Sequence, residues 1–251
     1  MEEQNEIAEN MLIADLCLYL EKSRALVVAD LHLGYEEMLN NQGVMIPRVN
    51  YNEIKKRIER AFSELKAKRK KIELIIVNGD FKHEFGVPSQ QEWKEVLDML
   101  EFLQAHCGEI ILIKGNHDNI LGPIARWKGL KIIGDCFFAE KERALIMHGD
   151  KGIDETSENY KNSKVLIIAH EHCAVTLREG AKSEKYRCFL RGNYDGKILI
   201  AQPAISAIAE GSDVSRQMPL SPFLQQDLAE FEVFVVEDKV YYFGRLKNIL
   251  Q

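Results

Sequence analysis

The sequence predicts an α/β protein, and three observations support this fold class. Short apolar runs of strand length alternate with amphipathic helical patterns over the first part of the chain. Five apolar runs end in residues that can bind a metal or transfer a proton. From Cys173 onward, short apolar runs alternate with polar turns, which favours a second, largely antiparallel sheet.

The chain is expected to open with two strands, residues 12–20 and 25–29, joined by a polar turn. Residues 33–50 hold two glycines and a proline and predict a loop. A helix that Asn50 or Asn52 could cap follows, with apolar residues at helical spacing on one face. Its other face is rich in basic residues, namely Lys55, Lys56, Arg57, Arg60, Lys66, Lys68, Arg69, Lys70 and Lys71.

The middle of the chain repeats this alternation of strand and helix. Apolar runs predict strands at 74–77, 110–113, 144–147 and 165–169. An amphipathic helix opens at Pro88 and Ser89, and a short helix is expected over residues 123–127. Further short strands are expected at 173–177, 186–190, 198–201, 233–236 and 240–243, and residues 209–222 predict a long surface loop beside the site.

Composition limits the class of protein. The net charge of −6 argues against a protein that binds nucleic acid merely by being basic. The five cysteines are scattered and odd in number, which is typical of reduced thiols rather than of a disulfide framework. An acidic N-terminus and the lack of a long apolar run predict a cytoplasmic protein with no membrane partner.

The candidate site consists of the polar residues that end the five apolar runs. They are Asp30, His32, Asp80, Asn116, His117, His148, His170 and His172. In open α/β sheets, ligands gather beyond the carboxyl ends of the strands. We therefore expect these residues to meet although they are far apart in the sequence.

The candidate ligands are carboxylates, imidazoles and an amide, without a thiolate. This set disfavours a structural zinc site and fits Mn²⁺, Fe²⁺ or Zn²⁺ with open positions. Seven of these eight residues, all except His117, are candidate ligands; seven are too many for one such ion, and they suit two ions about 3.5–4 Å apart that share a carboxylate. His117 could donate a proton or steady a phosphoryl oxygen, and Asp118 could orient it.

The motifs resemble those of a known superfamily. Asp30-x-His32, Gly79-Asp80, Gly115-Asn116-His117-Asp118, His148 and His170-x-His172 are similar to the five ordered motifs of the calcineurin-like metallophosphoesterases. The resemblance implies a four-layer α/β/β/α sandwich of two mixed sheets. It also implies a single domain over residues 1–251, with the metal motifs at 30–172 and the second sheet in 173–251.

The resemblance also implies a role for each residue. One ion would be held by Asp30, His32, Asp80 and His172. The second would be held by Asp80, Asn116, His148 and His170, with Asp80 bridging the two. His117 would stabilise the phosphate or donate a proton, backed by Asp118. Mn²⁺ is the expected metal, and Fe²⁺, Zn²⁺, Ni²⁺ and Co²⁺ are alternatives.

Two details refine the resemblance. His83, three residues after Asp80, is similar to the G-D-x-x-H histidine that assists catalysis in the repair nucleases of the superfamily; a hydrogen-bonding role is the alternative. The tail looks like that of the archaeal SbcD-related phosphoesterases. Ala169 replaces a common glycine, and Cys173 stands where proline is common.

The expected function is metal-dependent hydrolysis of a phosphodiester by a nuclease or phosphodiesterase, with DNA or RNA as candidate substrates and DNA repair as the implied setting. The alternatives are an enzyme for cyclic nucleotides, nucleotides or phosphomonoesters, and a non-catalytic metal-binding scaffold. A homodimer is left open. The basic face of the first long helix is expected to be a solvated surface rather than a nucleic-acid contact.

Overall fold

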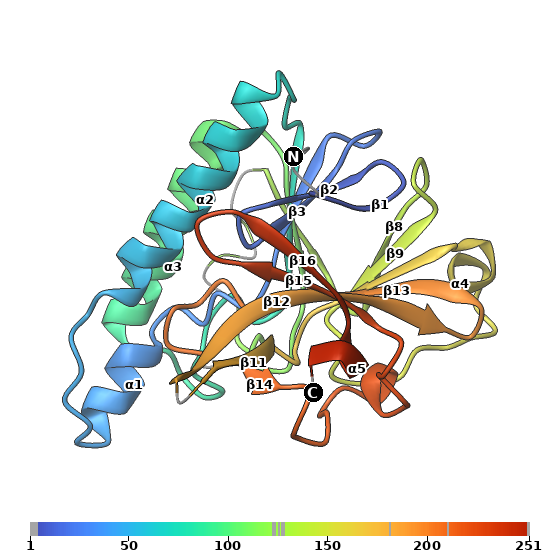
Figure 1. The fold of residues 1–251 in the computed structure, drawn as a ribbon. Helices are drawn as coiled ribbons and strands as arrows, with labels where there is room; N and C mark the ends of the chain where they lie inside the picture. The colour runs from blue at the N-terminus through green and yellow to red at the C-terminus, as the bar shows by residue number, and fades with distance from the viewer. Residues whose placement is uncertain are drawn as a thin grey trace.

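The computed structural model describes residues 5–121, 124, 126, 129–180, 182–209 and 211–249. The first sheet in this part of the chain runs in sequence order from β1 to β7, and β1, β2 and β3 are labelled in Figure 1. Its strands are β1 (Glu6–Ala8), β2 (Met11–Ala14), β3 (Cys17–Leu20), β4 (Ala25–Val28), β5 (Leu74–Asn78), β6 (Ile110–Ile113) and β7 (Leu130–Ile133). Strands β1 to β4 pair antiparallel and β4 to β7 pair parallel.

The second sheet follows the order β14-β11-β12-β13-β10-β9-β8, and β15 and β16 extend it from β12. Its strands are β8 (Cys136–Ala139), β9 (Ala144–Met147), β10 (Val165–Ile168), β11 (Cys173–Glu179), β12 (Lys182–Tyr194), β13 (Lys197–Ala201), β14 (Ser212–Asp213), β15 (Glu232–Val236) and β16 (Val240–Arg245). Strand β10 pairs parallel with both β9 and β13, whereas β8 and β12 pair antiparallel with their neighbours. Both sheets are therefore mixed.

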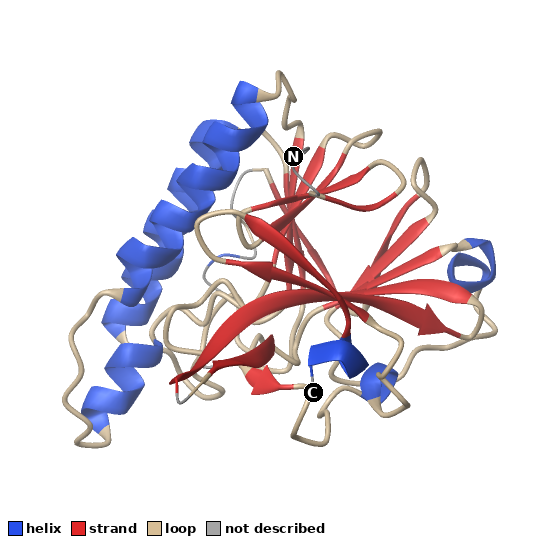
Figure 2. Ribbon diagram, in the orientation of Figure 1, coloured by secondary structure: helices blue, strands red, loops and turns tan. Residues whose placement is uncertain are grey.

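Two long helices cover the first sheet, with one short helix packed against them, and the other short helices lie beside the second sheet (Figure 2). The helices are α1 (Tyr35–Asn41), α2 (Asn50–Ala67), α3 (Gln90–His106), α4 (Glu158–Asn162), the 3-10 turn η2 (Pro222–Leu224) and α5 (Leu246–Ile249). The Ser89 hydroxyl caps α3 by accepting a hydrogen bond from the N–H of Glu92. None of the described helices combines the length and the apolar character that a membrane crossing requires.

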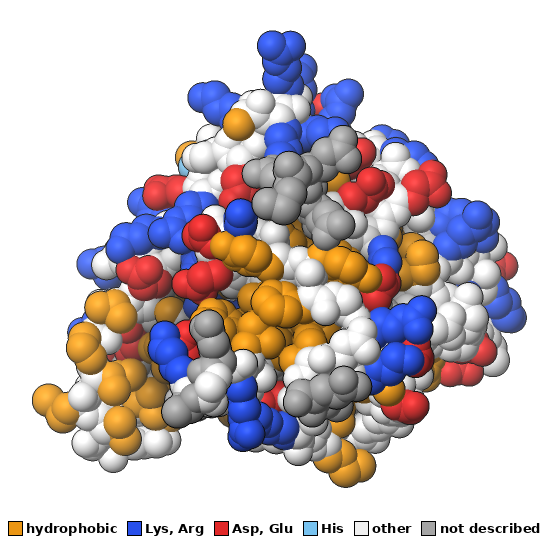
Figure 3. Space-filling view, in the orientation of Figure 1, with side chains coloured by type: hydrophobic (Ala, Val, Ile, Leu, Met, Phe, Trp, Pro, Cys, Tyr) orange, Lys and Arg blue, Asp and Glu red, His pale blue; other side chains and the backbone are white. Residues whose placement is uncertain are grey.

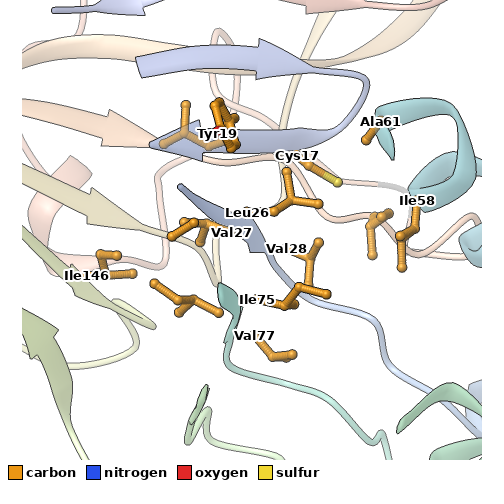
Figure 4. Packing of buried hydrophobic residues seen from close by; sticks show 14 of the residues in the cluster. Cys17, Tyr19, Leu26, Val27, Val28, Ile58, Ala61, Ile75, Val77 and Ile146 are labelled. Atoms are coloured by element: carbon orange, nitrogen blue, oxygen red, sulfur yellow. The ribbon is translucent and has the colours of Figure 1, made fainter. Parts of the chain in front are cut away.

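The core explains why these layers pack together. Ile58 and Ala61 of α2 are fully buried and lie on one side of the first sheet, while Ile146 of β9 lies on the other side (Figure 4). Alternate residues of β4 can serve both faces because successive strand side chains point in opposite directions. A separate cluster, which includes Tyr160 of α4 and Leu246 of α5, covers the second sheet. The expected α/β/β/α architecture of two mixed sheets is confirmed.

Three expectations for individual elements were wrong. The strand expected at 12–20 is a hairpin, because Asp15 takes a positive φ of 48° and its carboxylate accepts from the N–H of Leu16. The loop expected at 33–50 contains α1. The second sheet begins at β8, well before Cys173. The short helix expected at 123–127 lies mostly outside the described residues, and the single-domain boundary at 1–251 stays a prediction.

Candidate metal centre

The candidate ligands come from both sheets and meet where the ends of their strands face each other. Asp30 and His32 follow β4, Asp80 follows β5, and Asn116 follows β6 of the first sheet. His148 follows β9, and His170 and His172 follow β10 of the second sheet. Backbone hydrogen bonds tie the sheets together here, since the N–H of Ser206 donates to the carbonyl of Asp30. The seven candidate ligands are brought together by this arrangement.

The backbone at these positions is strained. Eleven described residues other than glycine have a positive φ, and five of them are candidate ligands: Asp30, His32, Asp80, His170 and His172. A positive φ costs free energy in residues that carry a Cβ, and such strain concentrates at functional sites. Backbone hydrogen bonds beyond the strand ends hold this conformation, because the N–H of His32 donates to the carbonyl of Asp80 at 2.9 Å.

The carboxylates of Asp30 and Asp80 are held in the same way. The N–H of His117 donates to Asp80 Oδ1 at 2.9 Å, and the N–H of His170 donates to Asp30 Oδ2 at 3.1 Å. The second oxygen of each carboxylate faces the histidines. Asp80 Oδ2 lies 3.3 Å from His148 Nε2, and Asp30 Oδ1 lies 3.6 Å from His172 Nε2. One oxygen thus fixes each carboxylate and the other is directed into the site.

His148 shows that this site is suited to a cation. Its Nδ1 faces the carbonyl of Asn78 at 3.2 Å, and a carbonyl only accepts, so Nδ1 carries the proton. The lone pair of Nε2 then points at Asp80 Oδ2 and at Asn116 Oδ1, which is 3.1 Å away. Burial opposes a charged ring, yet hydrogen bonding to Asp80 and the charge of Asp30 raise the pKa of His148 to about 9. Without a metal, a proton supplies the positive charge that these acceptors require.

The surroundings of Asp30 also indicate that the site is suited to a cation. Its side chain is fully buried, and Oδ1 has no hydrogen-bond partner within the described residues. Burial alone would raise its pKa, but the neighbouring His172 and His148 more than offset this and hold the pKa below its usual value. A buried carboxylate oxygen without a donor is costly unless a cation lies beside it.

His32 and His83 form a pair. His32 Nε2 lies 3.1 Å from His172 Nε2, inside the ligand cluster, while its Nδ1 lies 3.2 Å from His83 Nδ1. Burial and the charge on His172 lower the pKa of His32 to about 3, which keeps the ring neutral and able to bind a metal. The position of His83 suits a residue that orients a metal ligand.

His117 and Asp118 have different partners from those expected. The Nδ1 of His117 donates to the carbonyl of His83, which leaves Nε2 facing Asp80 Oδ2 at 3.9 Å. The Asp118 carboxylate instead accepts from the N–H groups of Phe81, Lys82 and Gly115. Burial, then the charge of Asp80, raises the pKa of Asp118 to about 6. Its contacts therefore fix the loops that carry Asp80 and Asn116.

Among the described residues, ligand atoms gather in three overlapping groups, and the atoms of each group lie within 4.8 Å of one another. The first is Asp30, His32, Asp80 and His172, and the second is Asp80, His148 and His170, beside which Asn116 lies. These groups correspond to the two expected ligand sets, with Asp80 in both. The third is His32, His83 and His117. Family and geometry together indicate a divalent-metal site.

Two residues that are not candidate ligands support the site. Lys82 is fully buried, and its ammonium donates to the carbonyls of His117 and Glu84. Glu171 is also buried, and its Oε2 accepts from the N–H groups of Leu220 and Ser221. Glu171 thereby attaches the expected 209–222 loop to the segment between two candidate ligands. Only its place between His170 and His172 could have pointed to this role.

The two positions that depart from the family motifs lie in ordinary packing. Ala169 and Cys173 are buried, and burial raises the pKa of the Cys173 thiol well above its ordinary value. A thiol of this kind is inert.

The basic face of α2 extends away from the site. The helix starts at Asn50, whose Oδ1 accepts from Ser206 close to Asp30, and its 18 residues span about 27 Å. Lys66 and Arg69 therefore lie at the far end, where α2 leads toward the start of β5. Lys and Arg side chains cover that end of the molecule in Figure 3.

Comparison with known proteins identifies the family. Residues 23–176, more than half of the chain, match the sequence model of the calcineurin-like phosphoesterases, and the protein belongs to this family. Family membership supports a phosphoester hydrolase.

Solved structures were compared with this fold. The nuclease MPE of Pseudomonas putida is similar with a TM-score of 0.63 and 19% identity, over 92% of this chain and 93% of that chain. The phosphoesterase Yfce of E. coli gives a TM-score of 0.37 and 12% identity, over 88% of this chain and 97% of that one. Of these two scores, that of MPE is high enough to indicate the same fold.

Proposed function

We propose that this protein is a phosphodiester hydrolase that requires two divalent ions and acts on nucleic acid. The observation that carries the proposal is that acceptor atoms of Asp30, Asp80 and His148 converge in the site. In the metal-free protein, a proton supplies the positive charge that these acceptors require. Mn²⁺ is the proposed metal, since carboxylate, imidazole and amide ligands suit it.

The proposed ligand sets are those implied by the family. Asp30, His32 and His172 would hold one ion, Asn116, His148 and His170 would hold the other, and Asp80 would contribute to both. Two bound ions would supply charge to neutralise the phosphate and acidity to activate a water.

His117 is proposed as the proton donor or phosphate-stabilising residue. Because Nδ1 is occupied by the carbonyl of His83, Nε2 is the atom that can hold a proton and release it to a leaving oxygen. His83 orients His32 and supplies that carbonyl, so its proposed role includes positioning as well as assistance to catalysis. Asp118 is proposed to hold the loops rather than to contact His117.

Nucleic acid is favoured by two points. The similar structure with the higher TM-score is that of a nuclease, and His83 fits the histidine motif of repair nucleases. Since Lys66 and Arg69 lie at the far end of α2, phosphates next to the metal centre would be held by other residues. A cytoplasmic location, a role in DNA repair, a homodimer and the archaeal SbcD-related assignment stay predictions.

A small-molecule phosphodiesterase is the second candidate. A cavity of about 340 Å³ lies beside His148 and is also lined by Lys114, Cys136 and Asp150. A cavity of this size fits a small ligand such as a nucleotide.

A substrate panel distinguishes the candidates. Metal-free protein, and protein loaded with Mn²⁺, would be incubated with single- and double-stranded DNA, RNA, cyclic nucleotides, monoesters and an aryl phosphodiester. The proposal predicts turnover of diesters only with metal, and cleavage of at least one nucleic acid. Turnover restricted to small substrates would favour the second candidate, and no turnover in fully metal-loaded protein would favour a scaffold.

A further inference from the structure

Four aromatic rings follow one another beside the candidate site. The ring of Tyr35 stacks on His83 with centroids 3.8 Å apart and an interplanar angle of 13°. His83 stacks on His117 at 4.9 Å and 30°, and His117 contacts Phe85 at 3.8 Å and 31°. We call Tyr35, His83, His117 and Phe85 the ring stack. The two histidines lie inside it, and Phe85 is its outer ring.

Phe85 is an unusual end for this stack because it is 53% exposed. One exposed apolar residue needs no explanation by itself. This one, however, contacts the proposed proton donor and so lies at the mouth of the site. A large aromatic surface left in water beside a catalytic group is a typical place for an aromatic part of a ligand to bind.

The segment that carries Phe85 is held in place by hydrogen bonds. Glu92 Oε1 accepts from the N–H groups of His83 and Glu84 at 2.9 and 2.8 Å. The carbonyl of Glu84 accepts from the buried ammonium of Lys82, and Glu84 Oε1 accepts from the N–H of Gly86. Because the backbone on both sides is fixed, the Phe85 ring is preorganised for binding.

We propose that Phe85 is a stacking subsite for a nucleobase attached to the phosphodiester at the metal centre. The inference rests on the proposed function and adds a recognition residue to it. Phenylalanine offers no hydrogen bond to a base edge, so the subsite would accept any base. Stacking of a base on an aromatic side chain typically changes affinity by roughly 5- to 150-fold when the side chain is replaced by alanine.

The rival explanation is that Phe85 only supports the ring of His117. The two roles differ in what they affect. A support role would reduce turnover of every phosphodiester, because it acts through the proton donor. A stacking role would affect substrates that carry bases, mainly in KM, and would spare substrates without them.

The test uses two single-stranded oligonucleotides of equal length and equal phosphate number. One is oligothymidylate and the other has tetrahydrofuran abasic residues throughout. Values of kcat and KM would be measured with Mn²⁺ for the parent and for Phe85→Ala, Phe85→Leu and Phe85→Trp. Val87→Ala is the matched control, since Val87 is 84% exposed in the same segment and is not part of the ring stack.

The parent should prefer oligothymidylate. Phe85→Ala and Phe85→Leu should lose roughly 5- to 150-fold in kcat/KM on it, mainly through KM, and little on the abasic oligonucleotide. Phe85→Trp and Val87→Ala should keep the preference. An equal loss on both oligonucleotides, or no loss on either, would overturn the inference while the proposed function stands. Turnover of an aryl phosphodiester but of neither oligonucleotide would overturn the nucleic-acid substrate and the inference with it.

Discussion

Gly115 provides a sharp test of how the metal centre is built. A Cβ at this position would lie 2.1 Å from Asp80 Oδ1 and 2.4 Å from the backbone N of Asp80. Real Cβ atoms essentially never approach other atoms below 3.0 Å, so in Gly115→Ala the carboxylate would have to retreat by about 1 Å. Metal ligands must usually be held within about 0.5 Å of their working positions.

The expected losses follow from this displacement. Overpacking of this kind costs about 1–3 kcal/mol in the free energy of unfolding, which for a chain of this size lowers Tm by roughly 2–12 °C. Because Asp80 belongs to both proposed ligand sets, affinity should fall by at least roughly ten- to hundred-fold at both ion sites.

The assay is calorimetric titration of metal-free protein with Mn²⁺, combined with thermal unfolding. Gly134→Ala is the control, because a Cβ there would meet nothing within 4 Å. It should match the parent in both measurements. If Gly115→Ala bound Mn²⁺ with the stoichiometry and affinity of the parent, Asp80 would not be the shared ligand and the reasoning would be refuted.

Three further predictions concern the site. His117→Ala should keep its metals but slow hydrolysis of an aryl phosphodiester by roughly two to four powers of ten, and unchanged turnover in a fully metal-loaded variant would rule out its role as a proton donor. Asp80→Ala should weaken the binding of both ions, whereas His32→Ala should weaken the binding of mainly one. Metal analysis in which His32→Ala loses both ions equally would contradict the two-site assignment. Because Asp80 and Asp30 raise the pKa of His148 to about 9, metal binding must displace a proton from this ring, so the apparent affinity for Mn²⁺ should rise by up to roughly tenfold per pH unit between about pH 6 and pH 8. Titrations that show no dependence on pH in this range would exclude proton displacement at His148.

The clustering of the candidate ligands could be predicted because the end of a strand can be recognised in the local sequence and also lies at the edge of the sheet. An apolar run that stops at Asp80 or His148 marks both the strand and the edge of the sheet where it ends. Sheet geometry then brings distant residues together without further information. The same reasoning fails for residues 11–20, where an apolar run interrupted only by Asp15 contains a turn that depends on the positive φ of that residue.

Contacts made by tertiary packing were not predictable in this way. The Asp118 carboxylate was expected to contact the neighbouring His117, yet in the structure it accepts from three N–H groups on two loops. The ring stack depends on α1, which lies in a segment rich in glycine and turn residues and was expected to be a loop. Lys82 appeared in the sequence only as one more charged residue, although its ammonium is buried against the carbonyl of His117.

The central claim is that two divalent ions bound by these residues make the protein a phosphodiester hydrolase. The most direct measurement is a titration of metal-free protein with Mn²⁺ in which bound metal and hydrolysis of an aryl phosphodiester are followed together. We predict about two ions per chain at saturation, with negligible turnover before metal is added and full turnover only when both sites are filled. Turnover that persists in metal-free protein, or none at saturating metal in a folded protein, would contradict the claim.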